Sequence, residues 1–163
     1  MCNVMEMTKL RRENEALKAK LALFQTPCIE RPSPRGVIEF DQVEFLAGKV
    51  VIKYPSLVCM LPTGSDSMDP LLDLGDIVIG TEDFDKDSLV VGDIVVYYYG
   101  GTIPAVHRID SITLDMQGRL YRLLGDNNGG NLDPYLVRND HIKYLVVGIL
   151  YIKKTVALNG TPI

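Results

Sequence analysis

Two serines, Ser65 and Ser67, lie close together in a polar stretch of the chain at residues 61–70. A serine hydroxyl attacks a carbonyl carbon only when a base removes its proton and when nearby amides or hydroxyls stabilise the oxyanion. A loop that contains glycine, serine and aspartate can present Ser67 in this way, but these residue types also form ordinary turns. From this stretch alone, a nucleophile and a polar turn are both open.

One of the two histidines in the chain, His107, lies in a segment that favours a β-strand, residues 103–112. Because side chains alternate along a strand, we expect Ala105, His107 and Ile109 on one face and Arg108 on the other. His107 therefore points inward with apolar neighbours. A histidine there is either a hydrogen-bonded core residue or a base, and imidazole can serve as a base near neutral pH.

A long loop at residues 123–137 contains two candidate carboxylates, Asp126 and Asp133. Its Asn, Gly, Asp and Pro residues are also typical of tight turns. An aspartate that orients an imidazole, and offsets its charge when it is protonated, would be the third member of a Ser-His-Asp triad.

Read in order, these segments resemble the catalytic boxes of type I signal peptidases, in the branch of archaea and the endoplasmic reticulum. In that branch histidine replaces the lysine base of the bacterial enzymes. The matching motifs are Ser-Met-Asp-Pro at 67–70, Leu-Gly-Asp-Ile-Val at 74–78, Gly-Asp-Ile-Val-Val-Tyr at 92–97, Pro-Ala-Val-His-Arg-Ile at 104–109, Gly-Asp-Asn-Asn at 125–128 with Asp-Pro at 133–134, and Val-Gly-Ile at 147–149. Ordered motifs of this number are far more specific than any single one.

The resemblance implies a role for each candidate residue. Ser67 would be the nucleophile, His107 the general base and Asp133 the orienting acid, with Asp126 as second choice. The Ser65 hydroxyl and the Ser67 backbone amide would form the oxyanion hole. The activity implied is that of a serine endopeptidase that forms an acyl-enzyme, cleaves polypeptides after small residues, above all alanine, and uses neither metal nor cofactor.

The resemblance also implies a fold, and the chain departs from the family in three places. One is the loop at residues 123–137, which is one residue longer than usual between Asp126 and Asp133. We expect a mostly β domain, a signal peptidase/LexA-like antiparallel β barrel or folded sheet. Signal peptidases carry a membrane helix just before the nucleophile box, whereas this chain has a charged helix, a proline-rich segment and additional β-type residues. Asp66 precedes the nucleophile where signal peptidases commonly have glycine, and Gly-Asp-Ser-Met variants are similar to the related LexA-type self-cleaving repressors.

Two other functions remain as alternatives. One is a catalytically idle module that binds extended peptides at a strand edge. The other is a LexA-like self-processing regulator, for which the Ala47–Gly48 bond is a candidate cleavage site, although we expect a hairpin turn there. A LexA-type protein uses a lysine base and a DNA-binding domain, whereas no lysine occurs between Lys86 and Lys143 and the first 25 residues are too short for a helix-turn-helix.

The chain divides into three parts by composition. Residues 1–25 favour a helix, because they are rich in Leu, Ala, Lys, Glu and Arg and lack Gly and Pro. Apolar residues at a 3-4 spacing, with Asn14 at an a position, predict a short coiled coil through residues 5–25 that pairs in a homodimer or with a partner. Packing of this helix on the chain's own domain is the alternative. Three prolines at residues 26–36 predict a stiff linker, and residues 37–163 form the expected β catalytic domain, with strands at 37–46, 50–61, 77–79, 94–99, 105–112, 120–124 and 144–152.

Composition limits the remaining classes. The chain has 163 residues, 47% of them hydrophobic, and a net charge of -4 without a basic stripe, so we expect no nucleic-acid partner. Its three cysteines are widely spaced, which fits neither a disulfide framework nor a metal motif. No apolar run approaches the roughly 18 residues that a membrane span needs. We expect a soluble cytoplasmic protein, with peripheral membrane association left open.

Overall fold

A computed structural model describes residues 12–15, 17–18, 31–62, 65–99 and 104–152 of the chain. The chain divides into two units, residues 1–30 and residues 31–163. In the first unit residues 12–15 and 17–18 are helical. The remainder of the predicted helix at 1–25 lies outside the described residues, and its coiled coil stays a prediction. Across the described part of the chain, no helix is long and apolar enough to span a membrane.

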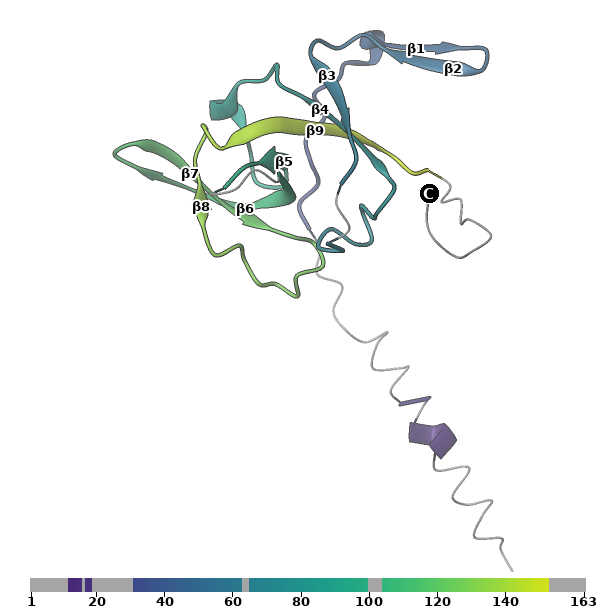
Figure 1. Ribbon diagram of the computed structural model, residues 1–163, viewed down its shortest axis with the longest axis vertical. Helices are drawn as coiled ribbons and strands as arrows, with labels where there is room; N and C mark the ends of the chain where they lie inside the picture. Colours follow the sequence, from purple (N-terminus) through teal and green to yellow (C-terminus); the bar gives the residue numbers. More distant parts are fainter. Residues whose placement is uncertain (1–11, 16, 19–30, 63–64, 100–103, 153–163) are drawn as a thin grey trace, which may run out of the picture. The chain divides into compact units, whose positions relative to one another are not determined.

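The second unit consists mainly of antiparallel β-sheet (Figure 1), which confirms the predicted mostly β class. A hairpin sheet pairs β1 (Val43–Leu46) with β2 (Lys49–Ile52), and a second sheet has the order β3-β4-β9-β5-β6-β7-β8. The bounds of its strands are Leu57–Met60 for β3, Ile77–Thr81 for β4, Ile94–Tyr97 for β5, Ala105–Asp115 for β6, Gly118–Leu124 for β7, Leu136–Val137 for β8 and Ile142–Leu150 for β9. Two 3-10 helices occur within the described residues, η1 at Phe40–Gln42 and η2 at Lys86–Ser88. The end strands β3 and β8 do not pair with each other in this part of the chain, so the sheet is open and the barrel alternative is not formed.

Several strand boundaries differ by two or three residues from the predicted ones, and three further differences change the pattern of strands. The strand expected at 37–46 begins only at Val43, because η1 occupies the residues before it. The strand expected at 50–61 is divided into β2 and β3 by a turn at Pro55 and Ser56. Proline has no backbone N–H to donate to a ladder, and Ser56 has a φ of 52°. The two-residue strand β8 was not predicted, because so short a strand has no readable alternation.

Strand β5 lies at the centre of the fold and is buried on both faces. Val95 and Tyr97 belong to one hydrophobic cluster, and Ile94 and Val96 belong to another. Its continuous apolar sequence is that of a strand covered on both sides. Because β5 also pairs with β6 on one edge and with β9 on the other, its side chains have fixed positions.

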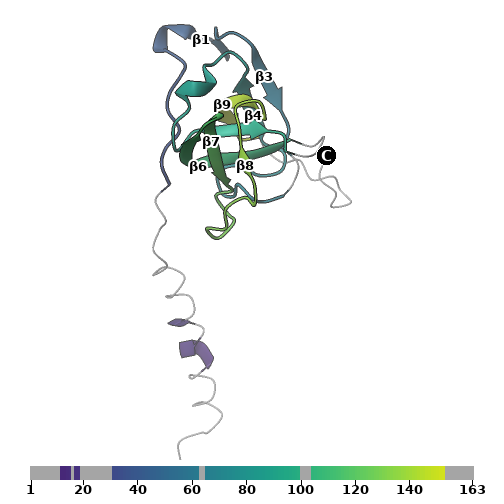
Figure 2. The ribbon, with the colours of Figure 1, turned by 90° about the vertical axis from the view of Figure 1, so that its left-hand side faces the viewer.

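The loop between β7 and β8, residues 125–135, extends from one end of the sheet (Figure 2). We call it the acid loop. Gly129 and Gly130 both have positive φ values, of 60° and 85°, which glycine adopts without a steric penalty. The amide N–H of Asp133 donates to the Leu123 carbonyl at 2.9 Å, so the second half of the loop returns to the end of β7.

Candidate active site

Ser67 lies between β3 and β4, in a segment that is held from two sides. Met68 and Leu72, just after it, are buried in the same hydrophobic cluster as Ile94 of β5. From the acid loop, the Asn127 amide N–H donates to the Ser67 carbonyl at 2.8 Å, and the Asn127 side chain donates to the Asp66 carbonyl at 2.9 Å. Core packing and the acid loop together position the Ser67 backbone.

His107 lies on β6, opposite Val95 of β5. Its side chain is buried, as the alternation predicts. The distance from His107 Nε2 to Ser67 Oγ is 3.0 Å, which is hydrogen-bonding distance. The imidazole therefore lies where it can accept the proton of the Ser67 hydroxyl.

Asp133 meets the other nitrogen of the same imidazole. The distance from His107 Nδ1 to Asp133 Oδ2 is 2.6 Å, and both side chains are 11% exposed. A neutral histidine that donates from Nδ1 to a carboxylate accepts at Nε2. Carboxylate, imidazole and Ser67 hydroxyl thus form one continuous chain of hydrogen bonds, in the order that a catalytic triad requires.

The second-choice acid, Asp126, has a different partner. Its carboxylate forms a two-point ion pair with Arg108, at 2.9 Å from Nε to Oδ1 and 2.6 Å from Nη2 to Oδ2. Both side chains are nearly buried. Arg108 also donates to the carbonyls of Pro32 and Gly92. Asp126 therefore ties the start of the acid loop to β6, and the structure brings Asp133 rather than Asp126 to the histidine.

Ser65 lies beside the nucleophile candidate. Its hydroxyl oxygen is 3.1 Å from that of Ser67, and either group can be the donor. Its proximity to the Ser67 hydroxyl makes Ser65 a suitable donor for an oxyanion formed there, together with the Ser67 backbone N–H.

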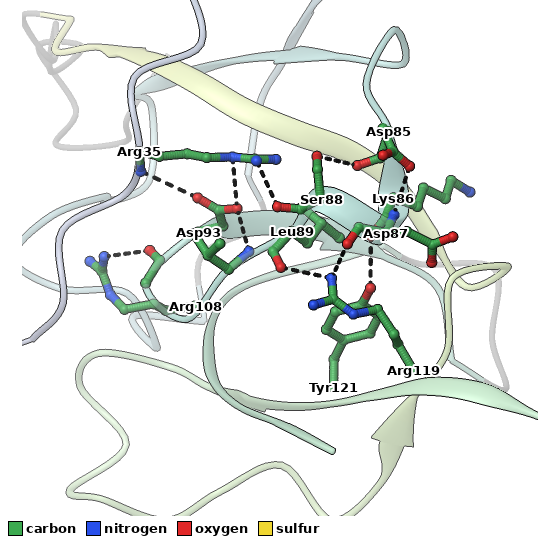
Figure 3. A network of polar contacts seen from close by, with 12 residues as sticks. Arg35, Asp85, Lys86, Asp87, Ser88, Leu89, Asp93, Arg108, Arg119 and Tyr121 are labelled. Carbon is green, nitrogen blue, oxygen red and sulfur yellow. Dashed lines mark hydrogen bonds and ion pairs between the residues drawn. The ribbon is translucent and has the colours of Figure 1, made fainter. Parts of the chain in front are cut away.

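An ion pair between a partly exposed arginine and a buried carboxylate holds the chain just before β5 (Figure 3). The Asp93 carboxylate is fully buried and meets Nε of Arg35 at 3.2 Å, while the Val90 amide donates to it at 3.0 Å. At Gly92, whose φ is 100°, a Cβ atom would lie 2.7 Å from the Ser33 carbonyl oxygen, so glycine is required. Residues 31–36 of the predicted linker therefore pack on the strands of the second unit and contact the residues just before β5.

A cavity of about 640 Å³ opens at the Ser67 and His107 side chains. Its walls are mainly apolar and come from several strands and the segments beside them, including Met60, Tyr98, Ala105 and Tyr144. A pocket of this size can hold a short stretch of peptide with small side chains. Asp66 also lines the cavity.

Sequence reasoning missed one residue of the site, Tyr97. Its hydroxyl donates to Asp133 Oδ2 at 2.7 Å and lies 3.3 Å from His107 Nδ1. Burial raises the pKa of the Tyr97 phenol far above its ordinary value, and the hydrogen bond to Asp133 raises it further. A tyrosine in an apolar run is otherwise typical of a core residue, so its sequence carries no separate signal.

The described residues contain no group of three or more His, Cys, Asp or Glu side chains that could hold a metal ion. Comparison with family models and with curated proteins finds no match to this chain. The assignment of a function therefore depends on the motifs and on the geometry of the site.

Proposed function

We propose that this chain is a serine endopeptidase of the signal-peptidase type. The observation that carries the proposal is the hydrogen-bonded chain Ser67–His107–Asp133, with distances of 3.0 and 2.6 Å. Its first two members line a mainly apolar cavity. Three residues that are far apart in the sequence meet in the order and with the atoms that a triad uses. The proposal includes the signal-peptidase-like identity of the β fold.

The reaction follows from these positions. His107 Nε2 takes the proton of the Ser67 hydroxyl while Oγ attacks the peptide carbonyl carbon, which forms a new C–O bond and a tetrahedral intermediate with a negative oxygen. The Ser65 hydroxyl and the Ser67 amide donate to the oxyanion. The carbon–nitrogen bond then breaks as His107 returns the proton to the leaving amine, which leaves the acyl group on Ser67 as an ester. Water, with His107 again as the base, releases the acyl group by the same steps. Asp133 holds the imidazole in the required tautomer throughout.

Substrates in this proposal are extended polypeptides with small residues, above all alanine, before the cut. Strand β3 is an edge strand of the second sheet, and in the described part of the chain its outer edge pairs with no other strand. Met60, the last residue of β3, lines the cavity. An extended peptide that pairs with this edge would pass the cavity and bring its carbonyl group to Ser67.

Cleavage of other chains fits the fold better than self-cleavage at Ala47–Gly48. This bond lies in the tight turn between β1 and β2, where Gly48 has a φ of 76°. A peptidase substrate must be extended, whereas a turn residue with positive φ is not. We also keep the coiled coil at residues 5–25, as a homodimer or partner contact, within the proposal.

The proposal is tested with a library of peptides that carry alanine or other small residues, incubated with wild type, Ser67→Ala and Ser111→Ala. The last variant is the control, since Ser111 lies further along β6 and outside the cavity lining. Wild type and Ser111→Ala should produce the same fragments, with cuts after small residues, and Ser67→Ala none. Intact peptides with wild-type protein, or equal cleavage by Ser67→Ala, would refute the proposal.

A further inference from the structure

The strand β5 carries a tyrosine that reaches the acid of the site. We propose that Tyr97 is a positioning residue, which holds the Asp133 carboxylate in the orientation that His107 needs. The inference rests on the proposed function, because the role of Asp133 belongs to it. It extends that function by a fourth residue, one that acts on the triad without touching substrate.

The contact geometry assigns the donor. The Tyr97 hydroxyl lies 2.7 Å from Asp133 Oδ2 but 3.3 Å from His107 Nδ1, so its single proton goes to the carboxylate. The side chain is 7% exposed, and its ring is tilted by 48° to that of His107. Because burial holds the pKa of the Tyr97 phenol far above its ordinary value, the hydroxyl is a donor near neutral pH. Oδ2 therefore accepts two hydrogen bonds, one from His107 and one from Tyr97.

Asp133 needs such support because of where it lies. It belongs to the acid loop and not to a strand, and its neighbour Leu132 is partly exposed. The backbone bond from Asp133 to Leu123 fixes its main chain but not the rotation of its carboxylate. Tyr97 comes from β5, which is buried on both faces and paired on both edges, so it links the acid of a loop to the centre of the sheet.

A second contact joins the same two segments. The rings of Tyr99 and Tyr135 stack, with centroids 4.2 Å apart and planes 17° apart. Tyr99 is two residues beyond Tyr97, and Tyr135 is two residues beyond Asp133. The acid loop is thus tied to β5 and its extension twice, by a buried hydrogen bond and by an outer aromatic stack. Tyr98, which lies between Tyr97 and Tyr99 in the sequence, lines the cavity.

The arrangement has an electrostatic consequence. A hydroxyl that donates to Oδ2 withdraws negative charge from the same oxygen that faces the imidazole. When Tyr97 is replaced by phenylalanine, the carboxylate attracts a protonated imidazole more strongly but is also less restrained in rotation. We therefore expect activity to appear at a higher pH on the acidic side, and to reach a lower plateau.

The test compares Tyr97→Phe with Tyr121→Phe, which is a matched control. Tyr121 is also buried, and its hydroxyl lies 2.8 Å from the Lys86 carbonyl and 2.7 Å from Asn139 Oδ1, outside the site. We expect Tyr97→Phe to lower plateau kcat about 10-fold without a change in KM, as expected for the loss of one hydrogen bond to a charged group. The acidic limb of its pH profile should move to higher pH. Tyr121→Phe should lower the Tm but keep the wild-type kcat and pH profile.

A measurement without substrate separates this inference from the proposed function. The chain has two histidines, so the ring signals of ¹⁵N-histidine-labelled protein can be assigned by their loss in His107→Gln. The titration midpoint of the His107 ring should move to higher pH in Tyr97→Phe and stay at the wild-type value in Tyr121→Phe. This shift in a protein that cleaves no peptide would support the inference while the proposed function fails. An active enzyme whose His107 titration and kcat are the same in Tyr97→Phe and wild type would overturn it.

Discussion

Replacement of Gly125 by alanine should damage the site more than the fold. Gly125 lies at the start of the acid loop, where an added Cβ atom would be 2.6 Å from the Ser67 carbonyl oxygen and 2.8 Å from Asn128 Nδ2. An ordinary contact begins at 3.4 Å, so the Ser67 backbone must move by about 0.8 Å. That shift acts on a hydroxyl that now lies 3.0 Å from His107 Nε2. A misplacement of about 1 Å in an active site costs on the order of 100-fold in rate.

The stability cost of the same change is moderate, because an overpacked contact costs about 1–3 kcal/mol. Gly36→Ala is the control, since a Cβ atom at Gly36 would meet nothing within 4 Å. We expect Gly125→Ala to lose about 100-fold in kcat on a peptide with small residues, with a Tm only several degrees lower, whereas Gly36→Ala keeps the wild-type kcat. Calorimetry and steady-state kinetics measure the two quantities. If kcat of folded Gly125→Ala lies within about twofold of Gly36→Ala, the Ser67 carbonyl does not set the position of its hydroxyl.

Two further predictions concern charge. Asp126→Asn leaves the nearly buried Arg108 guanidinium without its carboxylate partner. It should lower the free energy of unfolding, measured by urea titration, by about 3 kcal/mol. At low temperature it should keep more activity than Asp133→Asn, and equal loss of activity in the two variants would contradict separate roles for the two aspartates. The hydrogen bond from Arg138 holds the pKa of the Asp115 carboxyl below its usual range. A lowered pKa contributes stability that is fully present above the unfolded value and is lost as pH falls through the folded value. The Tm difference between wild type and Arg138→Gln should therefore be present at pH 7, begin to shrink near about pH 4 and vanish only at still lower pH; a difference that stays unchanged through this range would show that the contact does not depend on charge.

The sequence was informative where residue type alone carries the chemistry. The positions of Ser67, His107 and the two candidate aspartates could be read from motifs, and strand alternation predicted that His107 and Arg108 face opposite sides of β6. The structure places them so, with His107 beside Ser67 and Arg108 beside Asp126.

The identity of the acid and the contact of Tyr97 depend on how distant segments meet in the fold. Asp126 and Asp133 belong to one loop of turn-forming residues, and only the return of Asp133 to Leu123 brings one of them to the histidine. Tyr97 could not be found, because its meeting with Asp133 depends on the register of β5 with β6 and on a loop that no periodicity describes. The division between β2 and β3 could have been found, since Pro55 already argues against a continuous strand.

The central claim is that His107 activates Ser67 as a nucleophile, and covalent trapping tests it most directly. Wild-type protein and His107→Gln are incubated with a serine-directed fluorophosphonate, and intact mass and peptide mapping locate the adduct. We expect one adduct on wild type, at Ser67, and a rate of labelling at least about 100-fold lower in His107→Gln. Unlabelled wild type, an adduct on another residue, or equal labelling of the two proteins would contradict it.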